Sequence, residues 1–259
     1  MPGQRNSAMR SGLLVAGGML AIAGLVAAGL AERPVRAQVP AQVKPPTPEP
    51  LALGSAAPDF SLPATDGKTY SLASFKDSKA LAVIFTAVHC PTAEVYEERI
   101  KKLVADYRKR GVAVVAIQPN NATAVRLDEM GYTDLGDSLE DMKVRAEHRQ
   151  FNFPFLYDGE TQEISRKYGP VATPHIFVFD EQRKLRYHGR IDSNAREALA
   201  KVPEARNALD AVLAGTPVAV EKTPAVGCSV KWLDKKASRD AELAAFAKEP
   251  VGLEKVTVD

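Results

Sequence analysis

The stretch LAVIFTAVHCPTAEVYEERI, residues 81–100, changes character at its middle. Residues 81–88 form an apolar run rich in β-branched side chains, which predicts a strand buried on both faces. From Pro91 onward the apolar residues recur at helical spacing until Gly111, a typical helix end. That spacing is carried by Tyr96, Ile100, Leu103, Val104 and Tyr107. The stretch therefore predicts a central strand that passes directly into a helix, with Cys90 at the corner.

Cys90 stands where this predicted helix begins. Pro91 suits the first helical turn, because its missing N–H would have no partner there. The free N–H groups and the dipole of a helix N-terminus favour a thiolate, and can lower a thiol pKa by about one to several units from ~8.5. His89 adds a group that can be positive or donate a hydrogen bond, whereas a nearby Glu94 would oppose the thiolate. We interpret Cys90 as a reactive nucleophile; a buried structural cysteine is the alternative.

Strand and helix patterns alternate along the rest of the chain. Residues 58–75 predict two short strands around a turn at Thr65-Asp66-Gly67, and residues 112–119 predict a second buried strand. The other predicted strands are 153–158, 174–180 and 185–191. The other predicted helices are 121–130, 138–151, 161–169, 195–215 with a break at Pro203, and a short one at 239–248. This alternation, closed by a hairpin and a helix, indicates an α/β sheet with helices on both faces.

The N-terminus has the features of an export signal. Two arginines precede an uncharged stretch at residues 11–31, and Val35 and Ala37 occupy the −3 and −1 positions of a cleavage site. The stretch is also long enough to span a bilayer, so an uncleaved anchor is the alternative. We predict a signal peptide at 1–37 and an exported protein, periplasmic or secreted, that is attached to the membrane through residues 11–31 if the signal is retained.

Three further segments follow the predicted signal. A Pro-rich linker is predicted at 38–54, a folded domain at 55–216 and a C-terminal extension at 217–259. No internal repeat is apparent.

The composition is that of an ordinary globular chain, 45% hydrophobic and 25% charged. The formal charge is +2, but residues 38–259 carry 30 basic and 31 acidic side chains, a net charge of −1. This balance gives no indication of a nucleic-acid partner. The two cysteines, Cys90 and Cys228, are too few for a disulfide-stapled scaffold but sufficient for one bridge in an oxidising compartment. The sequence has no phosphate-binding loop, and we expect no cofactor.

Thr173-Pro174 directly precedes the apolar strand HIFVFD. Proline cannot donate to a sheet ladder, and a cis Thr-Pro bond is one way to accommodate it. Pro174 would then border a substrate groove, in which the Thr173 backbone offers edge hydrogen bonds to an extended peptide.

Three segments, in this order, resemble the thioredoxin-like superfamily, in particular its peroxiredoxin-related redoxin branch, the alkyl hydroperoxide reductase/thiol-specific antioxidant group. GSAAPDFSLPATDGKTYSLASFKD, residues 54–77, resembles the N-terminal hairpin of that branch. FTAVHCPTA, residues 85–93, resembles the thioredoxin segment that carries the first active-site cysteine, here Cys90. ATPHIFVFDEQRKLRYHGRID, residues 172–192, resembles the cis-proline strand and its hairpin. The resemblance implies an α/β thioredoxin-like fold, a central mixed β-sheet flanked by helices, with an N-terminal β-hairpin and a C-terminal extension.

The departures from the family pattern concern the chemistry. Ala93 stands where thioredoxins have their second cysteine and where true peroxiredoxins have the peroxidatic cysteine, and His89 replaces the usual tryptophan. The Pro and Thr positions of the peroxidase motif, counted from Cys90, hold Val83 and Ala87. The sequence is therefore not that of a typical peroxiredoxin, although an antioxidant role stays open. Cys-Pro without a second cysteine, together with GRID and TPAVGCSVKW, resembles an exported peroxiredoxin-like subgroup.

Cys228 lies in TPAVGCSVKW, residues 223–232, outside the predicted domain. Gly227 permits tight backbone geometry, and Trp232 could anchor the segment by burying its ring. We hypothesise that this tail folds back on Cys90: the Cys90 thiolate attacks a substrate disulfide and Cys228 resolves the mixed disulfide. A permanent structural bridge is the alternative, and either requires Cα atoms within about 7 Å.

Three functions remain open. The first is an exported thiol–disulfide oxidoreductase that acts on protein or small-molecule thiols and disulfides. The second is a redox-inert thioredoxin-like module that binds a protein in the Pro174 groove. The third is a Cu(I) or Zn metallochaperone with His89, Cys90 and His175 as ligands.

Four other polar residues are given structural roles. His148 and His188 are interpreted as surface or structural residues, and Arg190 and Asp192, in GRID, as members of an ion pair or hydrogen-bond network.

Overall fold

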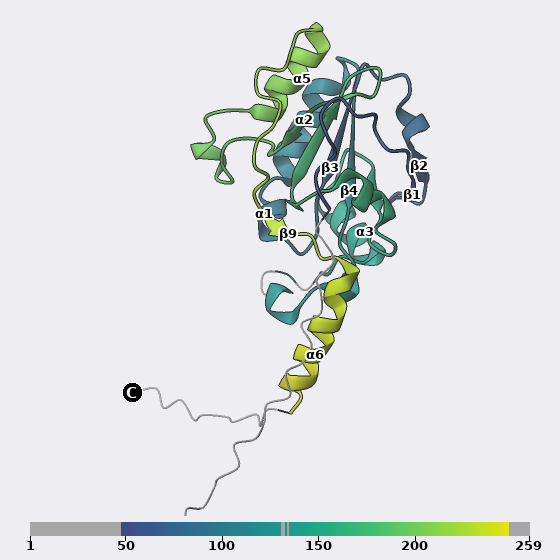
Figure 1. Cartoon of the computed structure of the whole chain (residues 1–259), viewed down its shortest axis with the longest axis vertical. Coiled ribbons are helices and arrows are strands. Elements are labelled where there is room, and N and C mark those ends of the chain that lie inside the picture. The colour runs from purple at the N-terminus through teal and green to yellow at the C-terminus, as the bar shows by residue number, and fades with distance from the viewer. Residues whose placement is uncertain (1–47, 131–132, 134, 249–259) are drawn as a thin grey trace, which may run out of the picture. The chain divides into compact units, whose positions relative to one another are not determined.

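The computed structural model describes residues 48–130, 133 and 135–248, all of which lie in the unit Lys44–Asp259 (Figure 1). The predicted signal peptide and the first ten residues of the predicted linker lie outside the described residues. The strands are β1 (Ser61–Pro63), β2 (Thr69–Ser71), β3 (Ala80–Phe85), β4 (Val112–Gln118), β5 (Phe155–Tyr157), β6 (Ala172–Thr173), β7 (His175–Phe179), β8 (Leu185–Gly189) and β9 (Cys228–Ser229). The α-helices are α1 (Pro91–Glu94), α2 (Glu97–Arg108), α3 (Leu139–His148), α4 (Glu163–Tyr168), α5 (Glu204–Ala214) and α6 (Lys236–Phe246).

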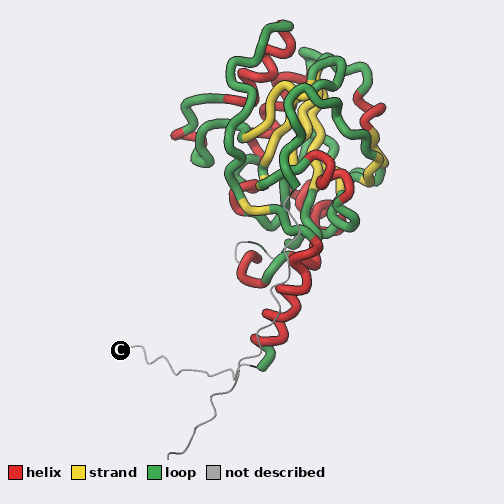
Figure 2. Tube along the Cα trace, viewed as in Figure 1, coloured by secondary structure: helices red, strands yellow, loops and turns green. Residues whose placement is uncertain are grey.

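A mixed five-stranded sheet, in the order β5-β4-β3-β7-β8, forms the centre of this unit. β3 and β4 are parallel, as are β4 and β5, whereas β7 runs antiparallel to both of its neighbours. Figure 2 shows these strands gathered in the interior with helices around them. The separate pair β1-β2 forms the predicted N-terminal hairpin. The predicted fold class, a thioredoxin-like mixed sheet flanked by helices, is confirmed.

β3 is the central strand, and all six of its residues are buried. Its side chains alternate between two cores because successive residues of a strand point to opposite faces. Ile84 packs in the core that contains α2 and α5, whereas Phe85 packs in the core that contains β1 and α4. Phe85 lies 5.5 Å, ring centroid to ring centroid, from the fully buried Tyr168. The continuous apolar run of the sequence thus reflects burial on both faces.

The sheet register brings the two predicted site segments together. Phe85, the last residue of β3, pairs with His175, the first residue of β7. Pro174 therefore lies next to the end of β3, from which the chain runs into Cys90 and α1.

Two predicted helices differ from the structure. The predicted helix that begins at Pro91 is divided into α1 and α2, because the Tyr96 N–H bonds to the Ala93 carbonyl in a tight turn. Residues 121–130 contain only 3-10 turns. There the Asn121 side chain accepts the Thr123 N–H, and the Asn121 N–H donates to the distant Lys231 carbonyl at 2.9 Å. Local side-chain capping and a tertiary contact thus replace the predicted helix.

The ends of the domain are held by backbone hydrogen bonds. Leu51, in the predicted linker, donates its N–H to the Tyr168 carbonyl at 2.9 Å. After α5 the C-terminal extension runs beside the edge strand β8: the His188 N–H donates to the Glu221 carbonyl, and the Thr223 N–H to the His188 carbonyl, both at 3.1 Å. The extension thereby covers a sheet edge that would otherwise be open. Across the described ranges, no helix is long and apolar enough to cross a bilayer.

Candidate active site at Cys90

Cys90 is the N-cap residue of α1 and is completely buried, with 0% of its surface exposed. Its backbone is extended, at φ −82° and ψ 115°, and the Ala93 N–H donates to its sulfur at 3.4 Å. Pro91 occupies the first helical position, as predicted. The amide of the first turn therefore points at Sγ, which is the geometry that stabilises a thiolate.

The Thr173–Pro174 peptide bond is cis and borders this cysteine. In its thiol form Cys90 donates to the Thr173 carbonyl at 3.3 Å, although 83 residues separate the two in sequence. Thr173 is itself fully buried. The strand-to-helix corner and the Thr-Pro segment therefore form one site.

Cys228 lies over the same site on β9. β9 pairs antiparallel with β6, and Cys228 stands opposite Thr173 in the register. Cys228 is half-buried and packs against Ala87, Cys90 and Ala93. Both cysteines are free thiols here, and the Cys228 thiol is a hydrogen-bond partner of the Cys90 sulfur. The structure thus brings together the two cysteines that the sequence separates by 138 residues.

The two thiols differ strongly in acidity. The pKa of Cys90 is lowered to about 6. The hydrogen bond from Cys228 has the largest effect, burial acts in the opposite direction, and hydrogen bonds from the Thr173 side chain and the Ala93 N–H lower the pKa further. The same hydrogen bond, with burial and the charge of the Cys90 thiolate, raises the pKa of Cys228. The pair therefore carries one thiolate, on Cys90, and one thiol, on Cys228, near neutral pH.

His89 does not face solvent; its ring is buried and paired with the carboxylate of Asp137. Asp137 is held in place by the Val88 N–H at 2.8 Å and the Asn120 side chain at 2.8 Å. Burial works to lower the pKa of His89, but the hydrogen bond and charge of Asp137 outweigh it and raise this pKa. His89 Nε2 is buried without a protein partner among the described residues. Asp137 was missed by sequence analysis, because it follows no motif and lies 47 residues beyond Cys90.

Both ring nitrogens of His175 have protein partners. Its Nδ1 accepts the Val171 N–H at 3.3 Å, and its Nε2 lies 3.3 Å from His188 Nδ1. Burial, with the charge of His188, lowers the pKa of His175 to about 3. In the part of the chain that the structure describes, no group of three or more His, Cys, Asp or Glu residues could hold a metal ion. The predicted ligand set His89, Cys90 and His175 is therefore not assembled.

The segment after Cys228 is held by buried amide side chains. Asn120 Oδ1 accepts the Lys231 N–H at 2.9 Å, while the Gln162 side chain donates to the Lys231 carbonyl at 2.9 Å and accepts the Leu233 N–H at 2.7 Å. Trp232 is 4% exposed, and the Arg166 guanidinium lies 4.8 Å from its ring centroid. Trp232 thus has the anchoring position predicted for it, whereas Asn120 and Gln162 carried no signal in the sequence.

Arg190 and Asp192 form ion pairs, but not with each other. Arg190 pairs with Glu204 at 2.6 Å. Asp192 pairs with Arg99 at 2.7 Å and accepts a hydrogen bond from the Tyr96 hydroxyl at 3.1 Å. Both interactions join the end of β8 to helices, which agrees with the structural role predicted for these two residues.

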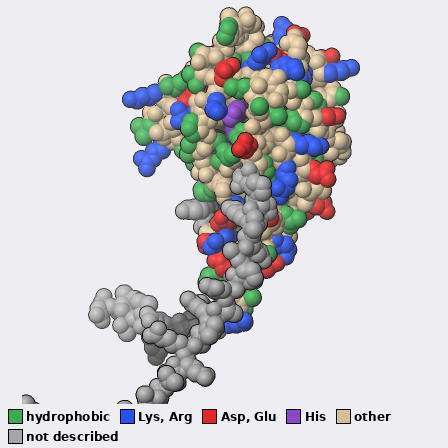
Figure 3. Space-filling view, viewed as in Figure 1, with side chains coloured by type: hydrophobic (Ala, Val, Ile, Leu, Met, Phe, Trp, Pro, Cys, Tyr) green, Lys and Arg blue, Asp and Glu red, His purple; other side chains and the backbone are tan. Residues whose placement is uncertain are grey.

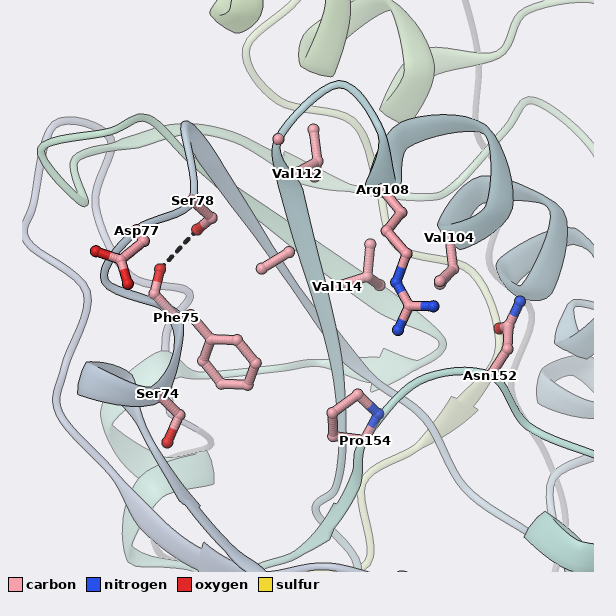
Figure 4. Close-up of a pocket in the computed structure, with 12 residues that line it drawn as sticks. Ser74, Phe75, Asp77, Ser78, Val104, Arg108, Val112, Val114, Asn152 and Pro154 are labelled. Carbon is pink, nitrogen blue, oxygen red and sulfur yellow. Dashed lines mark hydrogen bonds between the residues drawn. The ribbon is translucent and has the colours of Figure 1, made fainter.

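A pocket of about 350 Å³ lies away from the two cysteines, beside β4 (Figure 4). β5 pairs only with the last three residues of β4, so the side of β4 near Val112 and Val114 lines this pocket. Phe75 lines the other side of the pocket, and its carbonyl accepts a hydrogen bond from the Ser78 hydroxyl at 2.7 Å. No cysteine or histidine lines the pocket, so it is separate from the candidate site at Cys90.

Residues 53–188 match the model of the AhpC/TSA family, a span that includes both Cys90 and Pro174. The chain belongs to the AhpC/TSA family. The match ends at His188, so Cys228 lies outside the part that this AhpC/TSA protein shares with the family model.

The chain is also similar to individual proteins. The thiol-disulfide oxidoreductase ResA of Geobacillus thermodenitrificans is 24% identical over 136 residues, which cover 52% of this chain and 68% of the relative. Among solved structures, a hypothetical protein from Sinorhizobium meliloti 1021 is 36% identical, with a TM-score of 0.63 over 71% of this chain and 97% of that chain. An uncharacterized conserved protein from Geobacillus kaustophilus is also 36% identical, with a TM-score of 0.62 over 70% of this chain and 92% of that chain.

Proposed function

We propose that this AhpC/TSA protein is a thiol–disulfide oxidoreductase in which Cys90 and Cys228 form the redox pair. The observation that carries the proposal is the position of Cys228 on β9, opposite Thr173 and in contact with Cys90. The resemblance to the thiol-disulfide oxidoreductase ResA supports the same class of reaction. Cys90 is the internal nucleophile that forms the bond to Cys228, since a pKa of about 6 keeps it as a thiolate at neutral pH.

The reaction moves two electrons between this pair and an external pair of sulfurs. When the Cys90–Cys228 bond forms, a substrate disulfide is reduced to two thiols; in the reverse direction two substrate thiols become a disulfide and the protein becomes the dithiol. The buried ion pair of His89 with Asp137, next to Cys90, supplies a fixed polar environment for the thiolate. No cofactor enters this reaction.

We propose that residues 1–37 direct the protein to an exported compartment, periplasmic or extracellular, where a disulfide can persist. The partners proposed are protein or small-molecule thiols and disulfides. Acidic and basic side chains are interspersed on the face shown in Figure 3. We propose no nucleic-acid partner.

The proposal is tested by thiol counting and exchange kinetics on the full chain. After mild oxidation, we expect no free thiol and a single cross-linked peptide that contains Cys90 and Cys228. The wild-type protein should accelerate exchange between reduced glutathione and a small disulfide, and Cys90→Ser and Cys228→Ser should each lower that rate by about a hundredfold or more. Ser61→Ala, at an exposed serine of β1, is the matched control.

Two free thiols after oxidation, with exchange no faster than in buffer, would contradict the proposal. That result would favour the redox-inert binding module.

A further inference from the structure

Residues 223–233, here named the strap, are pinned on both sides of Cys228. On one side, the Thr223 hydroxyl bonds to the Tyr187 hydroxyl at 2.7 Å and accepts the Arg190 N–H at 3.1 Å. On the other side, Asn120 and Gln162 hold the backbone of Lys231 and Leu233, as described above. Cys228 is therefore carried by a short chain segment with two fixed ends.

Between these ends the strap lies directly on the edge next to the cis proline. Cys228 and Ser229 pair with Thr173 and Ala172. Gly227, at φ +157°, approaches so closely that a Cβ placed there would lie 1.9 Å from the Thr173 carbonyl oxygen. The edge that could pair with an extended substrate peptide is thus occupied by the protein's own chain.

This arrangement leaves the two sulfurs unequally accessible. Cys90 is 0% exposed beneath the strap, whereas Cys228, in the strap, is half-buried. An external thiolate must reach a sulfur of the disulfide before it can attack it. With the strap in place, Cys228 is the only one of the two cysteines with an exposed surface.

We propose that external thiols exchange through Cys228, and that Cys90 is the internal sulfur that never meets them while the strap is in place. This inference rests on the Cys90–Cys228 pair of the proposed function. It reverses the order expected from the sequence, in which Cys90 attacks the substrate and Cys228 resolves.

In the thiol-oxidising direction the reaction has two steps. An external thiolate attacks Cys228 Sγ of the oxidised pair, a bond forms between these sulfurs, and the Cys90–Cys228 bond breaks with its electron pair on Cys90. Cys90 remains as a thiolate, which accepts the Ala93 N–H and is a good leaving group. A second external thiolate attacks the first external sulfur, which releases Cys228; Cys228 takes up a proton, and the external product is a disulfide.

The test uses oxidised wild-type protein and two probes. One arm adds reduced glutathione, and the other adds an extended peptide with a single central cysteine. Each reaction is quenched in acid during the first turnover, and the position of the mixed disulfide is found by peptide mass analysis. We expect at least about tenfold more adduct on Cys228 than on Cys90 in both arms, and rates for the two probes within about threefold of each other, because the peptide gains no edge pairing.

A glycine variant tests the role of the strap without changing either cysteine. Gly227→Ala forces the strap away from Thr173, and should raise the share of adduct on Cys90 about tenfold or more. Gly215→Ala is the matched control, since Gly215 also has a positive φ, +65°, but has no atom within 4 Å of the added Cβ. It should leave the distribution unchanged.

The outcomes distinguish the two proposals. Absence of a Cys90–Cys228 disulfide after oxidation would overturn the proposed function and this inference with it. A disulfide that forms but gives adducts mainly on Cys90, or a peptide that reacts more than about tenfold faster than glutathione, would overturn this inference alone.

Discussion

Ala87 and Ala93 lie against Cys90 and leave space for Cys228. By the resemblance to peroxiredoxins and thioredoxins, they occupy the positions of a threonine of the peroxidase motif and of a second cysteine. In the sequence they indicate lost functions, but in the structure their small side chains allow the sulfur of a distant segment to pack on Cys90. The local partner is thus replaced by a tertiary one.

The first prediction concerns the acidity of Cys90. Cys228→Ala removes the hydrogen bond that contributes most to lowering the pKa of Cys90, so this pKa should rise from about 6 by about one unit or more. The measurement is the pH titration of thiolate ultraviolet absorbance in the reduced protein, which does not depend on access to the thiol. A midpoint unchanged by the substitution would contradict the assignment.

The same shift makes the stability of the reduced protein depend on pH. The folded-state pKa of Cys90, about 6, lies below the unfolded value of about 8.5. Its contribution to the free energy of unfolding is therefore complete above about pH 8.5 and is lost as the pH falls through about 6. The difference in free energy of unfolding between the reduced wild type and Cys90→Ala should follow this trend.

At the scale of elements, β9 is too short to hold itself in place. It consists of Cys228 and Ser229. Its position depends on the Thr223 side chain before it and on the Asn120 side chain, which accepts the Lys231 N–H after it. Gln162 is central to this anchoring because one side chain binds Pro119, Lys231 and Leu233. The position of the second cysteine therefore depends on hydrogen bonds at both ends of the strap as well as on the pairing of β9 with β6.

The second prediction is that Gln162→Ala loosens the strap. It removes three hydrogen bonds and leaves the buried Pro119 carbonyl and the Leu233 N–H without their Gln162 partner, and should lower the free energy of unfolding by about 1–3 kcal/mol. Gln150→Ala is the matched control, since both glutamines have a positive φ, 59° and 51°, but Gln150 is exposed. The readouts are urea unfolding and the exchange rate of the Leu233 amide hydrogen, which should rise in Gln162→Ala only. Equal effects of the two variants would show that the backbone conformation, and not the strap, accounts for the change.

At the scale of the whole described unit, the C-terminal extension joins parts of the fold that are far apart in sequence. It covers β8, pairs with β6 and is bound by the loop after β4 and by the N-terminus of α4. A disulfide between Cys90 and Cys228 would close a loop of more than a hundred residues. Closure of so long a loop restricts the unfolded chain strongly.

The third prediction follows from that closure. Oxidised wild-type protein should have a free energy of unfolding about 2–4 kcal/mol above that of the reduced protein. Urea unfolding with and without a reductant measures the difference, and Cys228→Ser should show no effect of the reductant. A reduced protein as stable as the oxidised one would argue that the bridge is strained or does not form.

The parts of the fold that follow local periodicity could be predicted. β3 and β4 are buried on both faces and therefore appear as apolar runs, and α5 starts directly after Pro203, where a break was expected. The predicted helix at 121–130 was wrong, because Asn121 binds the strap and caps a short turn. Asp137, Asn120 and Gln162 could not be predicted, since each acts through partners that are distant in sequence.

The sequence by itself determined the central buried strands, the helix start at Pro91 directly after Cys90 and the absence of a second cysteine at residue 93, because helix starts and apolar periodicity are local properties. Only the tertiary structure decided that Cys228 meets Cys90 and that the strap covers it. That contact depends on the pairing of β9 with β6, on the close approach of Gly227 to Thr173 and on buried amides that hold Lys231. None of these interactions leaves a local pattern, since each joins residues that only the folded chain places side by side.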